Sequence, residues 1–274
     1  MILTLDNITK SYSNIKALDS VSTKFETGHI YGLLGRNGAG KSTMIKTLTG
    51  KIFADEGTIA LDGKDPITDE GAKRNIYSVG EENYFVSGEK IKKIFKEYAY
   101  YTNRSFDEMC RLADKFELNI NKSWEKQSTG YRTIFKDILA LTASESFIFF
   151  DEPILGLDAT HRDLFYQLML EKFNLDKCFV ISTHLIEEVS KLIDSVKLIH
   201  HGKLIVDEEK EALLANLHRV SLNSNESIDL QNVVVLEDKT TPLGRSIIYK
   251  GDLNIEEDRI NNVDLQEYFI AVCK

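Results

Sequence analysis

The residues with the clearest capacity for chemistry form a glycine-rich run at positions 35–43. The run reads Gly35-Arg36-Asn37-Gly38-Ala39-Gly40-Lys41-Ser42-Thr43, with the G-x-x-x-x-G-K-S spacing of phosphate-binding loops. Glycines let successive backbone N–H groups turn toward phosphate oxygens, and a helix N-terminus adds partial positive charge. We therefore expect Lys41 to reach the β- and γ-phosphates of a nucleotide and the Ser42 hydroxyl to bind Mg²⁺. The alternative, a chance glycine turn before a helix, is disfavoured by the fixed spacing.

Two carboxylates follow an apolar run farther along the chain, where Phe147-Ile148-Phe149-Phe150 leads into Asp151 and Glu152. Four bulky apolar residues in a row indicate a central parallel strand, and ligands bind at the carboxyl ends of such strands. Beside a phosphate loop, Asp151 would hold the Mg²⁺ shell and Glu152 would orient or deprotonate the attacking water. The competing interpretation is a strand that stops at a solvated turn.

Two single residues are candidates because of where they stand. His184 lies just past the apolar run 178–182, as Glu152 lies past its own run, so it could hydrogen-bond the γ-phosphate. A lone histidine is nevertheless more often packed or solvent-facing. Tyr12 lies in a polar segment ahead of the phosphate loop, where it could stack on a base or simply pack on its neighbours. Position alone does not decide between these two interpretations of Tyr12.

The elements that must position these residues can be read from the periodicity. Residues 30–34 form a short apolar run that predicts a buried strand before the glycines, and Met44, Ile45 and Leu48 share one helical face after them. Residues 2–8 alternate and predict an edge strand. A helical pattern covers about 91–116, and residues 196–206 read as a hairpin. The tail shows short strands near 233–236 and 246–249 and an amphipathic helix near 263–270, without a chemical motif.

Length and composition limit the possible classes. The chain has 274 residues, with 42% hydrophobic and 28% charged residues, which is typical of a globular protein with a sizeable core. A net charge of −9 disfavours non-specific nucleic-acid binding and an electrostatic membrane anchor. The 3 widely spaced cysteines indicate neither a disulfide framework nor a zinc site. We find no signal-peptide pattern and no apolar run of the roughly 20 residues that span a bilayer.

Taken in order, these motifs resemble the nucleotide-binding subunit of an ABC transporter over about residues 1–210. Positions 35–43 match the Walker A loop, and 147–152 match the Walker B strand with Glu152 as its catalytic glutamate. His184 matches the switch histidine. The resemblance further implies that Tyr12 is the aromatic residue that stacks on adenine and that Asp158 belongs to the D-loop. It implies a signature loop, acting in trans, that consists of Ser128, Thr129 and Gly130. The ATP-binding residues that it implies are Tyr12, Gly35, Asn37, Gly38, Ala39, Gly40, Lys41, Ser42 and Thr43.

The resemblance implies an α/β fold of the P-loop NTPase class. Such a fold has a RecA-like core with a mixed parallel sheet, an antiparallel β part and an inserted helical subdomain, here about 84–144. We expect a cassette over 1–214 and a small α+β accessory extension over 215–274.

Two positions depart from the family pattern. The signature has Thr129 in place of a glycine and Tyr131 in place of a glutamine. The Q-loop glutamine is replaced by Glu81, with Glu82 as the second possible register. The expected Mg²⁺ ligands are therefore Ser42, Glu81 and Asp151. Degenerate motifs of this kind are similar to those of ABC-2 exporters, including drug and bacteriocin-resistance systems.

The function implied by the resemblance is ATP-driven closure of two cassettes, identical or different, that energises a membrane permease at the cytoplasmic face of the cell membrane. We expect an exporter and no nucleic-acid partner. A soluble ABC-type ATPase and a regulatory cassette with little turnover remain alternatives. A GTPase would need N-K-x-D, and the run 121–124 ends in Trp124 instead. The regulatory alternative is disfavoured because the catalytic positions Lys41, Asp151, Glu152 and His184 are intact. The altered Q-loop position nevertheless leaves this alternative open.

Overall fold

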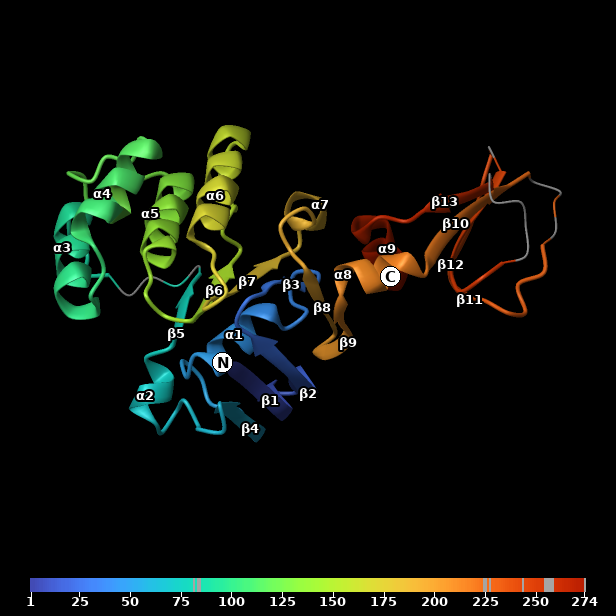
Figure 1. Cartoon of the computed structure of the whole chain (residues 1–274), viewed down its shortest axis with the longest axis horizontal. Helices are drawn as coiled ribbons and strands as arrows, with labels where there is room; N and C mark the ends of the chain where they lie inside the picture. The colour runs from blue at the N-terminus through green and yellow to red at the C-terminus, as the bar shows by residue number, and fades with distance from the viewer. Residues whose placement is uncertain are drawn as a thin grey trace.

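A computed structural model describes residues 1–80, 82, 85–223, 226, 228–242, 244–253 and 259–273 of the chain (Figure 1). The strands are β1 Ile2–Tyr12, β2 Ile15–Glu26, β3 Ile30–Leu34, β4 Glu56–Leu61, β5 Ile76–Val79, β6 Phe147–Asp151, β7 Cys178–Thr183, β8 Ser195–His200, β9 Lys203–Glu209, β10 Leu217–Leu222, β11 Val234–Thr241, β12 Gly244–Lys250 and β13 Ile260–Asn262. The helices are α1 Lys41–Leu48, α2 Glu70–Lys73, α3 Ile91–Thr102, α4 Phe106–Lys115, α5 Thr129–Leu141, α6 Ala159–Lys172, α7 Ile186–Val189, α8 Lys210–Ala215 and α9 Leu265–Val272, with a 3₁₀ turn at Trp124–Lys126.

The central sheet has the strand order β5-β6-β7-β3-β8-β9. Strands β5, β6, β7, β3 and β8 run parallel, and β9 joins β8 as an antiparallel hairpin. All residues of β3 and β7 are buried, which explains their continuous apolar runs. The carboxyl ends of β3, β6 and β7 therefore lie side by side, and the loops that carry the predicted chemistry leave from this edge. The predicted mixed parallel sheet is confirmed.

A smaller antiparallel sheet has the order β2-β1-β4 and packs against α1. The prediction that residues 2–8 form an edge strand is wrong, because β1 pairs with β2 on one side and β4 on the other. A strand with one solvated face alternates in the same way at an edge or in the centre of a sheet, so alternation could not separate the two cases. The strand also continues to Tyr12, which the sequence had placed in a loop.

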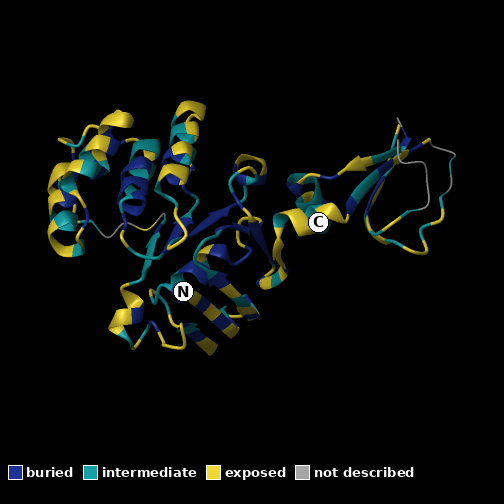
Figure 2. Cartoon of the chain, in the orientation of Figure 1, coloured by how far each residue is buried: buried dark blue, intermediate teal, exposed yellow. Residues whose placement is uncertain are grey.

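The helical pattern at 91–116 is confirmed as α3 and α4, which meet α5 in a separate layer (Figure 2). The helices break at Asn103, whose left-handed backbone closes α3. The buried face of α3 carries Ile91, Ile94 and Phe95, as the periodicity predicts. Figure 2 shows exposed residues along the outer surface of these helices and buried residues along the central strands.

The tail forms an antiparallel sheet in the order β11-β12-β10-β13, followed by α9. The predicted tail strands and final helix are confirmed, whereas the division of the chain at residues 214 and 215 stays a prediction. Val220, Leu222, Ile247 and Tyr249 make a small core within this sheet, but Leu265 and Ala271 of α9 and the following Cys273 belong to the main core. Within the described ranges, no helix combines the length and apolar character needed to cross a membrane.

Candidate functional site

The phosphate loop connects the buried strand β3 to α1, whose first residue is Lys41. Gly40 precedes this helix with a φ of 117°, and a Cβ there would lie 2.4 Å from the carbonyl oxygen of Ala17. Only glycine fits such a backbone and such a close approach. The loop is thus held against the neighbouring strand β2. The strand, loop and helix that the sequence predicts are all present.

Lys41 is buried, with a relative exposure of 6%. Its Nζ donates hydrogen bonds to the carbonyl oxygens of Gly35, at 2.7 Å, and Arg36, at 3.3 Å. It also lies 3.6 Å from Oε1 of Glu152. Burial lowers the pKa of Lys41, and the carboxylates of Glu152 and Asp151 oppose that shift. The lysine cation thus lies inside the loop, within reach of any phosphate that binds there.

Asp151, at the end of β6, lies next to two serines. The Ser182 hydroxyl donates to Oδ1 of Asp151 at 2.8 Å, and the Ser42 hydroxyl also hydrogen-bonds this carboxylate. Burial raises the pKa of Asp151, while the two serine hydroxyls act in the opposite direction. A hydroxyl and a carboxylate side by side fit Mg²⁺, which prefers oxygen ligands and takes the rest from waters and phosphates. The described part of the chain holds no group of three or more His, Cys, Asp or Glu side chains that could bind a metal without a nucleotide.

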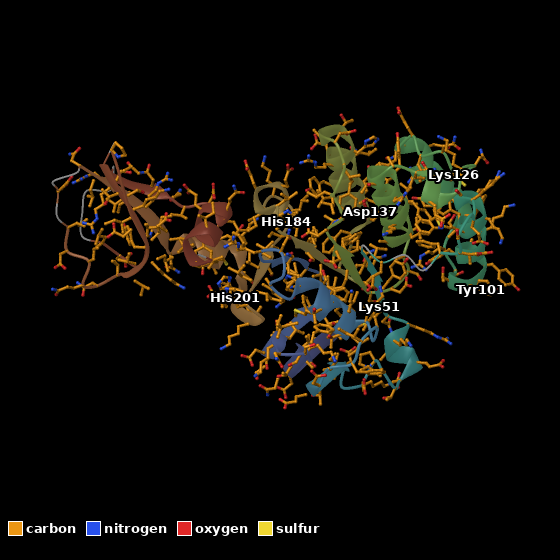
Figure 3. All side chains as sticks on the ribbon, turned by 180° about the vertical axis from the view of Figure 1, so that it is seen from behind. Lys51, Tyr101, Lys126, Asp137, His184 and His201 are labelled. Atoms are coloured by element: carbon orange, nitrogen blue, oxygen red, sulfur yellow. The ribbon has the colours of Figure 1, made fainter. Side chains whose placement is uncertain are left out.

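Glu152 has a left-handed backbone with a φ of 53°, which is uncommon for a residue that is not glycine. Its amide donates to the carbonyl oxygen of Ser182 at 2.9 Å. Its carboxylate accepts a hydrogen bond from Oγ1 of Thr183 at 3.1 Å and lies 2.9 Å from Nδ1 of His184. Figure 3 labels His184, which directly follows β7. Strained backbone of this kind persists where the surroundings fix it, as at functional sites. The structure therefore brings Glu152, His184 and Lys41 together.

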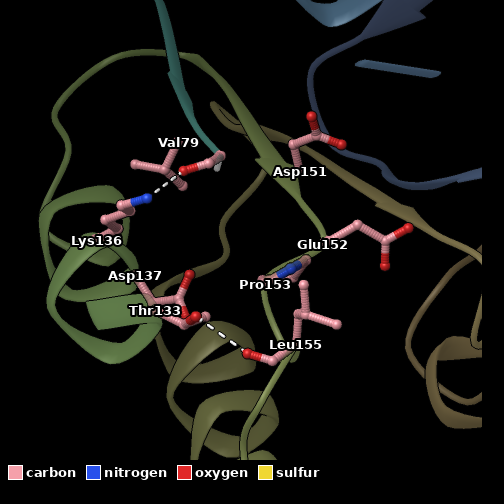
Figure 4. A pocket seen from close by; sticks show the side chains of 9 residues that line it. Val79, Thr133, Lys136, Asp137, Asp151, Glu152, Pro153 and Leu155 are labelled. Atoms are coloured by element: carbon pink, nitrogen blue, oxygen red, sulfur yellow. Dashed lines mark hydrogen bonds between the residues drawn. The ribbon is translucent and has the colours of Figure 1, made fainter. Parts of the chain in front are cut away.

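A small cavity of about 40 Å³ lies between the end of β6 and α5 (Figure 4). On one side are Asp151 and Glu152, and on the other are Lys136 and Asp137. Lys136 donates to the carbonyl oxygen of Gly80 at 2.6 Å. A Cβ on Gly80 would lie only 3.1 Å from the Cβ of Asp151, so the chain reaches the acid pair immediately before position 81.

The structure describes only one of the two Q-loop candidates. Glu81, predicted as a metal ligand, lies outside the described residues. Glu82, the second register, forms an ion pair with Lys46 of α1 at 2.6 Å. The assignment of Glu81 to the metal therefore stays a prediction, supported by the position of Gly80.

The signature residues lie at the start of α5. The Ser128 side chain caps this helix by accepting a hydrogen bond from the Tyr131 amide at 3.3 Å. A Cβ on Gly130 would lie 2.5 Å from the carbonyl oxygen of Gly156, so this glycine is needed for close packing. Thr129 is the first residue of α5. Asp158 caps α6 and accepts from the His161 amide at 2.9 Å. The signature and D-loop segments of one chain thus pack together.

Tyr12 ends β1 with 48% of its surface exposed, and the Nζ of Lys10 lies 5.9 Å from its ring centroid. An exposed ring at a strand end can accept a stacked base on its face. Stacking on adenine stays a prediction.

Sequence reasoning missed three participants. Ser182 was treated only as the last strand residue and Thr183 was given no role, although their hydroxyls hydrogen-bond Asp151 and Glu152. Hydroxyls at the end of an otherwise apolar strand were the signal that could have found them. Asp137 was not considered at all. It is 2% exposed, and among the described residues its Oδ2 has no hydrogen-bond partner.

A phosphate loop after a central strand, with an acid pair at the end of a strand in the same sheet, defines a P-loop NTPase. The family model described as ABC transporter matches residues 18–155, half of the chain, and the protein belongs to this family. It is an ATP-binding subunit, an ATPase cassette that energises an ABC transporter.

Relatives and solved structures agree with this placement. The chain is 28% identical over 246 residues to the ABC transporter ATP-binding protein YtrB of Bacillus subtilis, covering 86% of this chain and 83% of that protein. It is 29% identical over 217 residues to the Nod factor export ATP-binding protein I of Sinorhizobium fredii, covering 77% of this chain and 63% of that one. A dimeric bacterial ABC transporter cassette matches with a TM-score of 0.66 at 20% identity, over 76% of this chain and 98% of that chain. The structural likeness shows the fold.

Proposed function

We propose that this subunit hydrolyses Mg²⁺-ATP at the edge formed by β3, β6 and β7, and that it drives export. The observation that carries the proposal is the position of Glu152, whose carboxylate lies between His184, at 2.9 Å, and Lys41, at 3.6 Å. The triphosphate would take the loop around Lys41. Its γ-phosphate would then lie between the lysine and the carboxylate.

Each residue of the site has its own role in the proposed mechanism. Loop N–H groups and Lys41 bind and orient the phosphates, and Lys41 exchanges its bonds to loop carbonyls for bonds to phosphate oxygens. Ser42 and Asp151 would hold Mg²⁺, which neutralises phosphate charge when bound. Glu152 accepts the proton of the attacking water, and His184 holds this carboxylate in position relative to the γ-phosphate.

The proposal includes a second cassette, on whose phosphate loop the signature residues would act. Ser128, Thr129 and Gly130 contact α5 and Gly156 of the same chain in the described structure. In a head-to-tail pair they would cover the phosphates bound by the partner. ATP then stabilises the closed pair because it binds that state better than the open one. A solved cassette of the same fold is dimeric, which supports a pair of cassettes.

A permease is the remaining proposed partner, which would hold the subunit at the cytoplasmic face of the membrane. A groove of about 240 Å³ follows the Q-loop position, between residues 85–89 and α3. Its lining combines the exposed apolar side chains of Val86 and Tyr101 with the carboxylates of Glu89 and Glu97. Lys93 already pairs with both carboxylates, so the apolar side chains are what this groove offers to a partner segment. The export direction rests on the similarity to the Nod factor export protein and on the altered signature.

The test is phosphate release by the purified chain with ATP, in the presence of Mg²⁺ or of a chelator. Hydrolysis that requires Mg²⁺ is expected. Tight ATP binding without Mg²⁺-dependent hydrolysis, alone and with the co-expressed permease, would favour a regulatory cassette instead. Co-purification of the chain with membrane proteins from its own cells would test the permease partner.

A further inference from the structure

The short helix α7 follows His184 directly, and it lacks a cap of its own. Its N-cap residue is Leu185, whose apolar side chain makes no capping hydrogen bond. The first N–H groups of a helix have no partner within the helix, so another group must accept from them. Here the acceptor comes from the far end of the chain. The Glu187 amide donates to Oε1 of Gln266, the second residue of α9, at 3.2 Å.

The helix α9 is well placed to hold this contact. It packs on α7, and its Leu265 and Ala271 share the main core with Ile186 and Val189 (Figure 1). Its own start is fixed by a capping box in which Asp264 and Glu267 satisfy each other's amides. Gln266 therefore projects from a helix that is anchored on both its core side and its first turn.

The other end of α9 reaches the phosphate loop. The guanidinium of Arg36 lies 3.5 Å from the carbonyl oxygen of Cys273, which follows the last residue of α9. This is a long hydrogen bond, and the partial negative charge of the helix C-terminus adds to it. The Arg36 carbonyl in turn accepts from Lys41 at 3.3 Å. The tail helix thus contacts both sides of the site, at the phosphate loop and at the turn after His184.

We propose that α9 positions the catalytic machinery and that Gln266 is a positioning residue for ATP hydrolysis. It acts by capping α7, and α7 in turn sets where His184 meets Glu152. This inference rests on the proposed roles of Glu152 and His184. It assigns a function to the tail, which lies outside the residues 18–155 matched by the family model.

The test compares three variants of the full chain. Gln266→Leu keeps the volume but removes the acceptor. Gln266→Glu keeps the acceptor, and its negative charge suits a helix N-terminus. Gln167→Leu, at an exposed position of α6, is the matched control for loss of a glutamine. The readouts are hydrogen exchange of the amides at 186–189, kcat and KM for ATP, and ATP affinity by calorimetry.

For Gln266→Leu we expect exchange of the Glu187 amide to rise and kcat to fall by roughly fivefold, the factor expected for loss of a typical cap. KM and ATP affinity should stay unchanged, because the phosphate loop is untouched. Gln266→Glu should restore both readouts, and Gln167→Leu should resemble the wild type.

Unchanged exchange at 186–189, or an unchanged kcat, in Gln266→Leu would overturn the inference while the wild-type activity stands. A Gln266→Glu variant as slow as Gln266→Leu would also overturn it, because the acceptor would not be what matters. A wild type without Mg²⁺-dependent hydrolysis would instead overturn the proposed function, and the role of Gln266 with it.

Discussion

Nδ1 of His184 lies 2.9 Å from Oε1 of Glu152, although 31 residues separate the two along the chain. The register of the central sheet produces this contact. Asp151 of β6 pairs with Ser182 of the parallel strand β7, so the next residues, Glu152 and Thr183, also lie side by side. The chain then turns at His184 and brings the imidazole over the carboxylate. The pair is therefore a consequence of strand pairing, and it supports the proposed role of Glu152 as the base.

Replacing Glu152 by glutamine tests that role directly. Glu152→Gln keeps the shape and the hydrogen-bonding reach but removes the basicity of the carboxylate. We expect hydrolysis to fall by about 10²–10⁴-fold, the usual contribution of general-base catalysis. ATP should still bind, and the closed dimer should accumulate because the hydrolysis that opens it is blocked. Size-exclusion chromatography measures this shift from monomer to dimer.

Glu211→Gln is the control for this experiment, since Glu211 is an exposed residue at the start of α8. It should hydrolyse ATP like the wild type. A Glu152→Gln protein with wild-type hydrolysis would exclude Glu152 as the base. A missing dimer alone would not, because the closed pair can depend on the permease.

Lys41→Ala should remove most of the affinity for ATP. The substitution leaves the clustered phosphate charge without its buried cation, and it also exposes the carbonyl oxygens of Gly35 and Arg36 that Lys41 now satisfies. Calorimetric titration with ATP measures the effect, with the exposed Lys122→Ala as control. Equal ATP affinity for Lys41→Ala and the wild type would contradict the phosphate-loop assignment.

The sequence predicted the core of this site better than its surroundings. Residues 35–43, Asp151 and Glu152 were found because glycine spacing and an apolar run ending in acids are local patterns. The contacts of Ser182 and Thr183 were not found, because they depend on which strands are neighbours. The same limit explains β1, whose alternation does not report whether one or two strands pair with it. It also explains α9, because a helix pattern in the tail says nothing about its docking on α7.

Tyr12→Ala should weaken ATP binding by roughly 1–3 kcal/mol, the typical contribution of a base stacked on an aromatic ring. The ring is half exposed at the end of β1, so its removal should cost little stability. Tyr12→Phe should be nearly neutral because the π face survives. ATP affinities of the two variants measure the effect. A large loss with phenylalanine would show that the hydroxyl matters and that stacking does not.

Glu81→Gln should change the metal dependence of hydrolysis. Gly80 abuts Asp151, so position 81 follows a residue that lies beside the proposed Mg²⁺ ligands Asp151 and Ser42. Losing one negative charge there should weaken metal binding and raise the Mg²⁺ concentration for half-maximal activity. Titrations with Mg²⁺ and Mn²⁺ measure this change, and Glu82→Gln is the matched control for the other register. Superimposable titrations of Glu81→Gln and the wild type would assign Glu81 to a solvated loop.

Asp137 should make the protein less stable as the pH rises. Its carboxyl is buried in α5, and burial raises its pKa well above the ordinary value of 3.8. The charged groups near it are Lys136 on its own helix and the acid pair Asp151 and Glu152 across the cavity. Since the folded state binds this proton more tightly than the unfolded state, the free energy of unfolding falls as the pH climbs above 3.8 toward the raised pKa.

Asp137→Leu removes both the titration and the unpartnered oxygen, and the adjacent cavity of about 40 Å³ offers room for the added carbon atoms. We expect this variant to be more stable than the wild type by about 1–3 kcal/mol at pH 7, the usual cost of a buried polar group without a partner. The difference should shrink as the pH falls toward 3.8, where a growing share of the unfolded carboxyls is protonated like the folded one. Thermal unfolding of both proteins at pH 4.5, 6 and 7.5, values chosen to span roughly the unfolded pKa and neutrality, measures the trend. A stability difference that is constant across this range, or that grows toward acid pH, would show that the Asp137 carboxyl is charged in the folded protein.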